Sequence, residues 1–315
     1  MHISITGDLG SGKSTVAKEI ARILQFKYLS TGVIQRQLAL EKGMNTLEFN
    51  EYTSKHPEID DYIDQTLKDV NEQREPYVLD ARLGWRFVPR SFKVYLMAMN
   101  EVAALRVLSD SQRIGEPSAS DINAKIRDLL KRKAIEDERF HQKYGIKPDI
   151  FKDFNAVIDT SAASSDEVVS LILSLYERFQ TENLKRTVWL SPYRIYPLKN
   201  MPRFPFNAVE EIMQKLTDGE KFAYSPVVCM LRQNEFYLYK EDCRLSAHIR
   251  LKYPFVPVAL EAEDDENITP DKTVAEYITS LLDKNILIQW ENEHRFIFDH
   301  YPSVLHQKTE KRDLL

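Results

Sequence analysis

Nine consecutive residues near the start of the chain have the types and spacing of a phosphate-binding loop. Residues 7–15 read Gly-Asp-Leu-Gly-Ser-Gly-Lys-Ser-Thr. Glycines let backbone N–H groups approach phosphate oxygens closely, while the charge of Lys13 suits the β- and γ-phosphates and the hydroxyl of Ser14 suits Mg²⁺. The candidate nucleotide-binding residues are Gly7, Gly10, Ser11, Gly12, Lys13, Ser14 and Thr15. The alternative is a glycine-rich turn that binds nothing.

The residues on either side of this loop predict the elements that would position it. Ile3 and Ile5 indicate a short strand before the loop, and apolar residues recur at helical spacing over residues 16–24 after it. A phosphate loop requires this setting, because the N-terminus of the helix adds its positive end to the site. We therefore predict a nucleotide site between the first strand and the first helix.

Four further apolar runs follow in the first half of the chain, each ahead of a helical pattern. They cover residues 26–29, 77–80, 92–97 and 156–158. Five strands that alternate with helices predict an α/β fold with a parallel sheet covered by helices on both faces. A helix over residues 166–180 is expected to end this first domain, which we assign to residues 1–180.

A series of short motifs runs through the first domain. They are Thr31 and Gly32 with Arg36, residues 41–44, 57–64 and 78–85, Arg139 with Phe140, and residues 144–146 and 157–161. In residue types and order they resemble the cytidylate kinases, particularly the short archaeal type. The resemblance implies the fold of a P-loop nucleoside-monophosphate kinase and transfer of the γ-phosphoryl group of ATP to CMP or dCMP, with Mg²⁺.

The same resemblance implies where the acceptor binds. Thr31, Gly32, Arg36 and Arg82 fall on substrate-binding positions, and the two arginines fall on positions that grip the acceptor's phosphate. Arginine suits this role because its planar guanidinium binds phosphate oxygens bidentately. Simple surface solvation of the two side chains is the alternative.

Asp80 ends the predicted strand over residues 77–80 and is expected to face the phosphate loop. A carboxylate in this place commonly serves as an outer group of the Mg²⁺ site. We assign Asp80 to metal binding together with Ser14, and to catalysis together with Lys13. The alternative is an ordinary turn residue at the end of a strand.

Residues 118–144 are predicted to be helical and are dense in charge. Arg132 and Arg139 lie seven residues apart, about two helical turns, so they share one face. The resemblance implies that this region forms a lid and that both arginines are catalytic, bringing positive charge to the transferred phosphoryl group. A solvated charged helix remains the other interpretation.

The chain departs from the resembled family at several positions. Val33 and Asn155 stand where aspartates are expected, and Lys133 and Ile135 replace a Glu and a Ser of the lid. These departures leave the acceptor base open. A kinase for another small acceptor is therefore an alternative to a pyrimidine nucleoside-monophosphate kinase.

The second half, residues 186–315, follows a polar linker over residues 181–186 and predicts a smaller α+β domain. The expected elements are strands over residues 227–231, 235–239 and 255–260, helices over 242–251 and 273–282, a solvated acidic loop over 261–267, a closing hairpin of 286–290 with 295–298, and a frayed polar tail over 306–313.

Part of this half resembles the domain shared by ParB-like nucleases and sulfiredoxin. The motifs that carry the resemblance are residues 190–203, 225–228, 238–247 and 256–258. The family's phosphate-binding turn corresponds to residues 240–244, of which only Arg244 is kept. Two added carboxylates oppose phosphate binding there, which favours a docking or regulatory role toward a protein or DNA partner over catalysis.

Composition limits the remaining classes of function. The chain has 315 residues, 43% hydrophobic and 29% charged, with a net charge of −5, so general affinity for nucleic acids is not expected. Cys229 and Cys243 are too few for a disulfide scaffold or a four-ligand zinc site. No signal peptide or apolar run of membrane-spanning length is present, which predicts a cytoplasmic protein. A nucleotide-sensing regulatory protein is the alternative to an enzyme.

Overall fold

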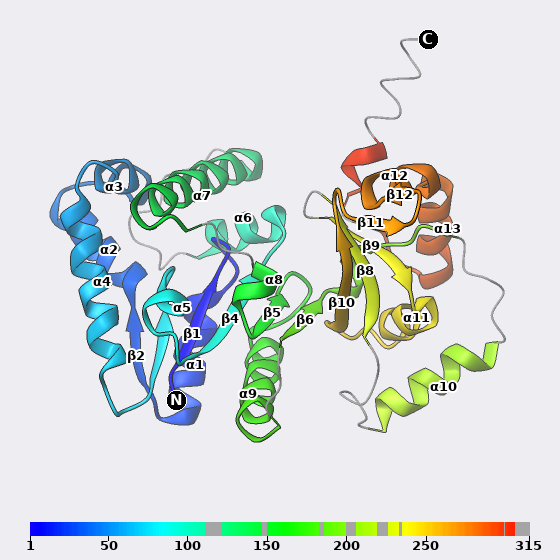
Figure 1. Cartoon of the computed structure of the whole chain (residues 1–315), viewed down its shortest axis with the longest axis horizontal. Coiled ribbons are helices and arrows are strands. Elements are labelled where there is room, and N and C mark those ends of the chain that lie inside the picture. Colours follow the sequence, from blue (N-terminus) through cyan, green and yellow to red (C-terminus); the bar gives the residue numbers. More distant parts are fainter. Residues whose placement is uncertain are drawn as a thin grey trace, which may run out of the picture. The chain divides into compact units, whose positions relative to one another are not determined.

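The computed structural model describes residues 1–110, 121–146, 150–182, 186–199, 206–218, 226–232, 235–298 and 300–305. The chain forms two compact units, Met1–Arg186 and Thr187–Leu315 (Figure 1). The division falls at the end of the region expected to be a linker, of which residues 183–185 lie outside the described residues.

Unit 1 alternates strands and helices as the sequence predicts. Its elements are β1 (Ile3–Gly7), α1 (Lys13–Leu24), β2 (Lys27–Ser30), α2 (Thr31–Glu41), α3 (Thr46–Thr53), α4 (Pro57–Asn71), β3 (Tyr77–Asp80), α5 (Gly84–Phe87), β4 (Phe92–Met97), α6 (Asn100–Ser109), α7 (Ile122–Tyr144), α8 (Ile150–Asp153), β5 (Ala156–Asp159) and α9 (Ser165–Thr181). Its strands follow the order β2-β3-β1-β4-β5, and every neighbouring pair is parallel. The predicted α/β fold class is confirmed.

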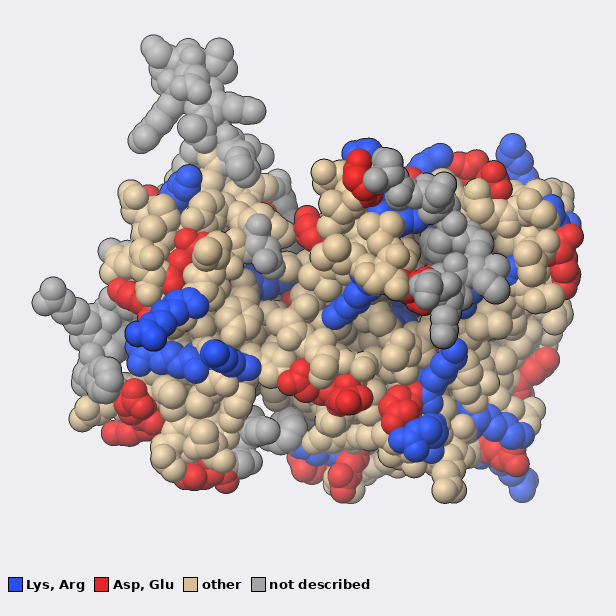
Figure 2. All heavy atoms as spheres, turned by 180° about the vertical axis from the view of Figure 1, so that it is seen from behind, with Lys and Arg blue, Asp and Glu red and all other residues tan. Residues whose placement is uncertain are grey.

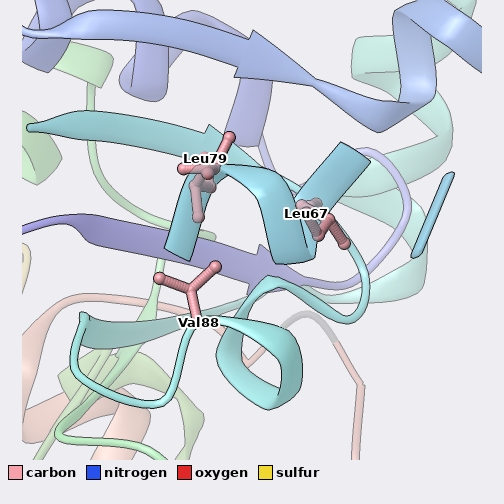
Figure 3. Close-up of a cluster of buried hydrophobic side chains, with 5 residues drawn as sticks. Leu67, Leu79 and Val88 are labelled. Atoms are coloured by element: carbon pink, nitrogen blue, oxygen red, sulfur yellow. The ribbon is translucent and has the colours of Figure 1, made fainter. Parts of the chain in front are cut away.

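Helices cover both faces of this sheet. On one face, the ring of Phe92 in β4 contacts those of Tyr176 and Phe179 in α9. On the other, Leu79 of β3 packs in a buried cluster with Leu67 of α4 and with Val88, as Figure 3 shows. Alternation along each strand sends successive side chains to opposite faces, so both layers are needed to bury the sheet.

The carboxyl ends of β1, β2 and β3 share one edge of the sheet, and they carry Gly7, Ser30 and Asp80. Gly7 must be a glycine here. Its φ is +146°, and a Cβ atom on it would lie 2.1 Å from the carbonyl oxygen of Leu96 in β4. The phosphate loop therefore leaves β1 pressed against the backbone of β4.

Unit 2 is the predicted α+β domain. Its elements are β6 (Thr187–Leu190), a 3₁₀ turn (Pro192–Arg194), β7 (Ile195–Tyr196), α10 (Phe206–Thr217), β8 (Val227–Arg232), β9 (Glu235–Lys240), α11 (Asp242–Arg250), β10 (Val256–Glu263), β11 (Asn267–Thr269), β12 (Lys272–Thr273), α12 (Val274–Leu281) and α13 (Lys284–His294). Its main strands follow the mixed order β6-β10-β8-β9-β7.

Two predictions for unit 2 are wrong. The expected closing hairpin is instead helix α13, because its buried residues Leu287, Trp290, Glu291 and His294 recur at helical spacing. The acidic stretch over residues 261–267 is only partly a loop, since β10 continues to Glu263. Helix α10 was not predicted, and the expected frayed tail lies outside the described residues.

Two buried histidines lie in the helices of unit 2, His248 in α11 and His294 in α13. Nδ1 of His294 lies 2.9 Å from the carbonyl oxygen of Trp290, and its Nε2 lies 2.7 Å from the hydroxyl of Ser246 in α11. Nδ1 of His248 lies 2.8 Å from the carbonyl oxygen of Arg244. The carbonyls require the proton on Nδ1, so the neutral rings fit these contacts.

We expect unit 2 to lose stability in mild acid. Burial lowers the pKa of His248 to about 4 and lowers that of His294 below 6.5. As the pH falls, the unfolded chain takes up protons before the folded one, so the stability from His248 is lost between about pH 6.5 and pH 4 and amounts to about 3 kcal/mol. Urea unfolding of the full chain at several pH values measures this loss. The variant His248→Gln should flatten the profile, and an unchanged profile in this variant would contradict the assignment.

Candidate active site

The lysine of the phosphate loop contacts the backbone of the loop itself. Nζ of Lys13 donates to the carbonyl oxygens of Gly7 and Asp8, at 3.0 and 2.6 Å. Helix α1 begins at Lys13, after Gly12 with a φ of +85°. The ammonium group and the helix N-terminus therefore lie at the same place, as a phosphate site requires.

Two cavities open beside the loop. The first, of about 490 Å³, is lined by Gly10, Gly12 and Thr15, and by Arg106 and Thr160 from other elements. The guanidinium of Arg106 in α6 is fixed by Thr160, whose hydroxyl and carbonyl oxygens lie 3.0 and 2.7 Å from its nitrogens. The second, of about 600 Å³, includes Ser14 and Arg36 among its lining residues.

Asp80 and Ser14 meet at the loop as expected. The hydroxyl of Ser14 donates to Oδ2 of Asp80 at 2.6 Å, and the same oxygen accepts from the hydroxyls of Ser30 and Tyr28, at 2.9 and 3.2 Å. Burial and then the charge of Asp80 raise the pKa of Tyr28 to about 12, which keeps this hydroxyl a donor. A hydroxyl beside a carboxylate is a pair of hard oxygen donors, so these residues fit Mg²⁺.

A buried carboxylate of α7 lies among three arginines. Glu136 of α7 lies 3.0 Å from Nε of Arg82 and 3.2 Å from Nε of Arg132, and it accepts from Asn50 of α3 at 3.1 Å. Burial alone would raise the pKa of Glu136. The charges of Arg82, Arg132 and Arg139 outweigh burial and lower this pKa to about 2. Glu136 is therefore ionised at neutral pH.

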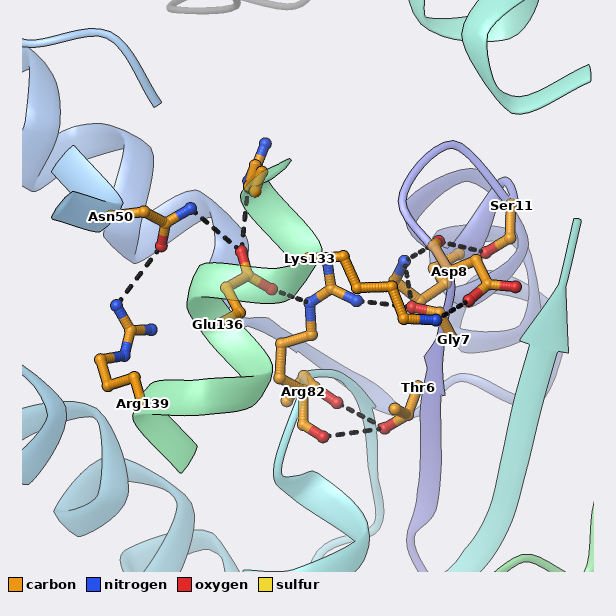
Figure 4. Close-up of polar contacts among 12 residues, drawn as sticks. Thr6, Gly7, Asp8, Ser11, Asn50, Arg82, Lys133, Glu136 and Arg139 are labelled. Atoms are coloured by element: carbon orange, nitrogen blue, oxygen red, sulfur yellow. Dashed lines mark hydrogen bonds and ion pairs between the residues drawn. The ribbon is translucent and has the colours of Figure 1, made fainter. Parts of the chain in front are cut away.

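Arg82 connects this carboxylate to the phosphate loop. Its Nη1 donates to the carbonyl oxygen of Gly7 at 2.6 Å, and Figure 4 shows the side chain extended between Glu136 and Gly7. Helix α7 and the phosphate loop thus share one guanidinium.

Arg139 lies further along α7 and faces the helices that follow β2. Its Nε is 3.3 Å from Oδ2 of Asp60 in α4, and its Nη1 donates to Asn50 at 3.4 Å. The side chain is only 6% exposed. Arg132 and Arg139 both approach the Asn50 and Glu136 pair, so neither is the solvated surface residue of the alternative interpretation.

The acceptor residues predicted from the sequence do not come together at one point. Thr31 and Gly32 begin α2, where the hydroxyl of Ser30 accepts from the N–H of Val33 at 3.3 Å. Arg36 lines the 600 Å³ cavity beside Ser14. Arg82 lines a different cavity of about 530 Å³, together with Trp85, Tyr95, Lys133 and Phe140.

Several residues that line or contact the site were not predicted to belong to it. They are Asp8, Tyr28, Asn50, Arg106, Lys133 and Glu136. One signal for Glu136 was present, because it lies four residues after Arg132 and three before Arg139, on the same helix face. Asn50 and Asp8 carried no such signal, since their partners lie far away in the chain.

The residues singled out in unit 2 do not form an activated site. Burial and then the charge of Asp242 raise the pKa of Cys243, the reverse of what a nucleophile needs. Glu241 has a φ of +74° at the start of α11, so this turn keeps a backbone conformation that favours glycine although a carboxylate occupies it.

The surface gives no sign of one dominant charge on the face that Figure 2 shows. There, the described Lys and Arg side chains are interspersed with Asp and Glu. None of the described helices combines the length and apolar character needed to cross a bilayer.

Comparison with known proteins identifies the first unit. A family model described as an AAA domain matches residues 3–128. Cytidylate kinases of Archaeoglobus fulgidus and Thermoplasma volcanium are each 34% identical over 178 residues, covering 56% and 55% of this chain and 95% and 90% of those proteins.

A third relative is the S-adenosylmethionine-dependent nucleotide dehydratase of Lacinutrix mariniflava, 34% identical over 177 residues. The match covers 56% of this chain but only 36% of that protein. The similarity to the two kinases spans nearly their whole length and lies in the N-terminal part of this chain. Through its first unit, a P-loop nucleoside-monophosphate kinase domain, this chain belongs to the cytidylate kinase family.

Proposed function

We propose that unit 1 transfers the γ-phosphoryl group of ATP to a pyrimidine nucleoside monophosphate, CMP or dCMP. The observation that carries this proposal is Arg82, whose guanidinium reaches from the carbonyl of Gly7 in the phosphate loop to Glu136 on α7. This guanidinium lies between the loop proposed to bind the phosphates of ATP and the arginines proposed to bind the phosphate of the acceptor. Phosphoryl transfer needs this kind of positioning and charge neutralisation rather than a protein nucleophile.

On the donor side, the phosphate loop binds the triphosphate through its backbone N–H groups and the N-terminus of α1. Two loop carbonyls hold the ammonium of Lys13 at the start of α1, beside the place proposed for the β- and γ-phosphates. Ser14 and Asp80 would hold Mg²⁺, which would neutralise phosphate charge.

On the acceptor side lie three positively charged side chains, Arg82, Arg132 and Arg139. In the structure they form ion pairs with Glu136 and Asp60. The acceptor's phosphate competes for these guanidinium groups and gains charge-assisted, bidentate hydrogen bonds. Arg36, with Thr31 and Gly32, approaches from α2 on the Ser14 side. The side chains of α7 exclude water, which would otherwise accept the phosphoryl group.

The test is ADP production from ATP and Mg²⁺ with a panel of nucleoside monophosphates. CMP or dCMP should give turnover at ordinary kinase rates, roughly 1–100 s⁻¹, and purine nucleotides should give much less. A preference for a purine monophosphate would overturn the choice of acceptor while keeping a kinase. Omission of Mg²⁺, with EDTA present, should abolish the reaction.

A regulatory, nucleotide-sensing protein is the second candidate, and one observation favours it. Fifty-six per cent of this chain covers 95% of the Archaeoglobus kinase, so unit 2 is additional to what that enzyme contains. In this alternative, unit 1 binds nucleotide and a ParB-like unit 2 engages a protein or DNA partner. Tight binding of ATP without turnover on the whole panel would support it, and turnover at kinase rates would count against it.

A further inference from the structure

The phosphate loop carries a carboxylate of its own. Asp8 directly follows Gly7, and its carbonyl oxygen accepts from Nζ of Lys13, the amine that is to meet the phosphates. The negative side chain of this residue, whose backbone carbonyl contacts that amine, opposes the binding of a triphosphate, because like charges repel. Something must neutralise Asp8 for ATP to bind well.

The neutralising group comes from the lid helix. Nζ of Lys133 in α7 lies 2.8 Å from Oδ1 of Asp8, which also accepts from the hydroxyl of Tyr95 at 2.9 Å. The backbone N–H of Ala98 donates to Oδ2 at 3.2 Å. The contact of Lys133 with the loop is visible in Figure 4. Burial alone would raise the pKa of Asp8, but Lys133, Tyr95 and Ala98 together lower it, so the carboxylate is ionised.

The two sides of this contact differ in how they are fixed. Tyr95 and Ala98 belong to β4 and the turn after it, which hold Asp8 in place whatever α7 does. Lys133 belongs to α7, which packs Ile122, Ile126 and Leu129 against α6 and makes polar or ionic contacts with α3 and α4, such as Lys131 with Glu51 at 2.9 Å. The charge of Asp8 is therefore neutralised by a lysine only when α7 is docked.

We propose that Lys133 is a positioning residue that makes ATP binding depend on the docked lid helix, by neutralising Asp8 of the phosphate loop. The role rests on the proposed ATP site but on no particular acceptor. Because binding free energies are reciprocal, ATP must in turn stabilise the docked position of α7.

Binding of a non-hydrolysable ATP analogue with Mg²⁺, measured by calorimetry without acceptor, tests the proposal. Lys133→Met should weaken binding by about 5- to 20-fold, and the loss should shrink at high salt. Adding Asp8→Asn should restore affinity to within about threefold of wild type. An asparagine can keep both loop contacts, since its carbonyl accepts from Ala98 and its amide can donate to Tyr95.

Lys131→Met is the matched control, because it removes a lysine of the same helix whose ion pair with Glu51 of α3 is largely exposed, so it contributes little to the docking of α7. Its affinity for the analogue should match that of wild type. If Lys133→Met binds as well as wild type, or if Asp8→Asn does not rescue it, the proposal fails. A merely structural role of Lys133 would not be rescued by a change in the loop.

Hydrogen exchange gives the second readout. The analogue should slow exchange of the backbone amides of α7 in wild type, and most of this protection should disappear in the variant with both substitutions. Equal protection in the two proteins would overturn the coupling. Both measurements need ATP binding but no turnover, so they remain decisive if the panel of acceptors yields no product, and turnover alone does not establish them.

Discussion

Replacing Lys13 with alanine should lower kcat/KM by at least about 10³-fold with any acceptor that the wild type uses. The ammonium is held by the carbonyls of Gly7 and Asp8 at the start of α1. It offers charge at the point where negative charge moves between phosphates, and loss of one such preorganised group commonly costs about 10²–10³-fold. The loss of ATP affinity adds to this effect. The measurement is ADP production at saturating CMP, with ATP varied.

Lys27→Ala is the control for this experiment. Lys27 begins β2 at the opposite edge of the sheet and pairs with Glu75 on the surface. Its removal should leave both kcat and KM within about twofold of wild type, as for most exposed positions. Thermal unfolding of Lys13→Ala should stay close to wild type, which separates lost chemistry from lost structure. Turnover within tenfold of wild type would contradict the assignment of Lys13.

Replacing Arg82 with methionine should damage acceptor use and stability together. The substitution removes the positive charge beside the carboxylate of Glu136, whose side chain is only 4% exposed. Glu136 then keeps Arg132 and Asn50 as partners. Breaking one partner of a buried ion pair leaves an under-compensated charge, here costing about 2–3 kcal/mol. The KM for the acceptor should rise about 10- to 100-fold, the value of a charge-assisted hydrogen bond. The KM for ATP should change less, because Lys13 still holds the loop.

A second substitution separates these two effects. Glu136→Gln in the Arg82→Met background removes the unpaired charge, so stability should recover by at least about 1 kcal/mol while acceptor binding stays weak. Arg86→Met, four residues further along the chain and exposed, is the matched arginine control. Urea unfolding and steady-state kinetics on the four proteins measure both quantities. An unchanged acceptor KM in Arg82→Met would remove Arg82 from the acceptor site.

The sequence by itself determined the features whose signals are local. The strand, glycine-rich loop and lysine of residues 3–15 specify a phosphate loop, because each residue acts on its immediate neighbours through backbone conformation and charge. The five strands of unit 1 were predicted for the same reason, since apolar alternation and length are properties of a short segment. Asp80 could be placed opposite Ser14 because parallel strands end at one edge of the sheet.

Local patterns were less decisive in unit 2. Residues 286–290 are rich in apolar residues and read as a strand, but they form part of α13. A short apolar run fits the periodicity of a helix or of a strand. Which of the two forms depends on which side chains the rest of the unit buries. Here Trp290 and His294 are buried, and Ser246 of α11 contacts the histidine ring. That choice was made by packing between helices.

Only the tertiary structure decided which charges meet at the active site. Glu136 contacts Asn50 from 86 residues away, and Lys133 contacts Asp8 from 125 residues away. Hydrophobic periodicity does not predict such pairs, because a charged residue on a helix fits a solvent-exposed position equally well. The packing of α7 against α3 removes Glu136 from water, and a charge removed from water must find its partner. For this reason the phosphate loop could be predicted from the sequence, whereas the partners of these charged side chains depend on the tertiary structure.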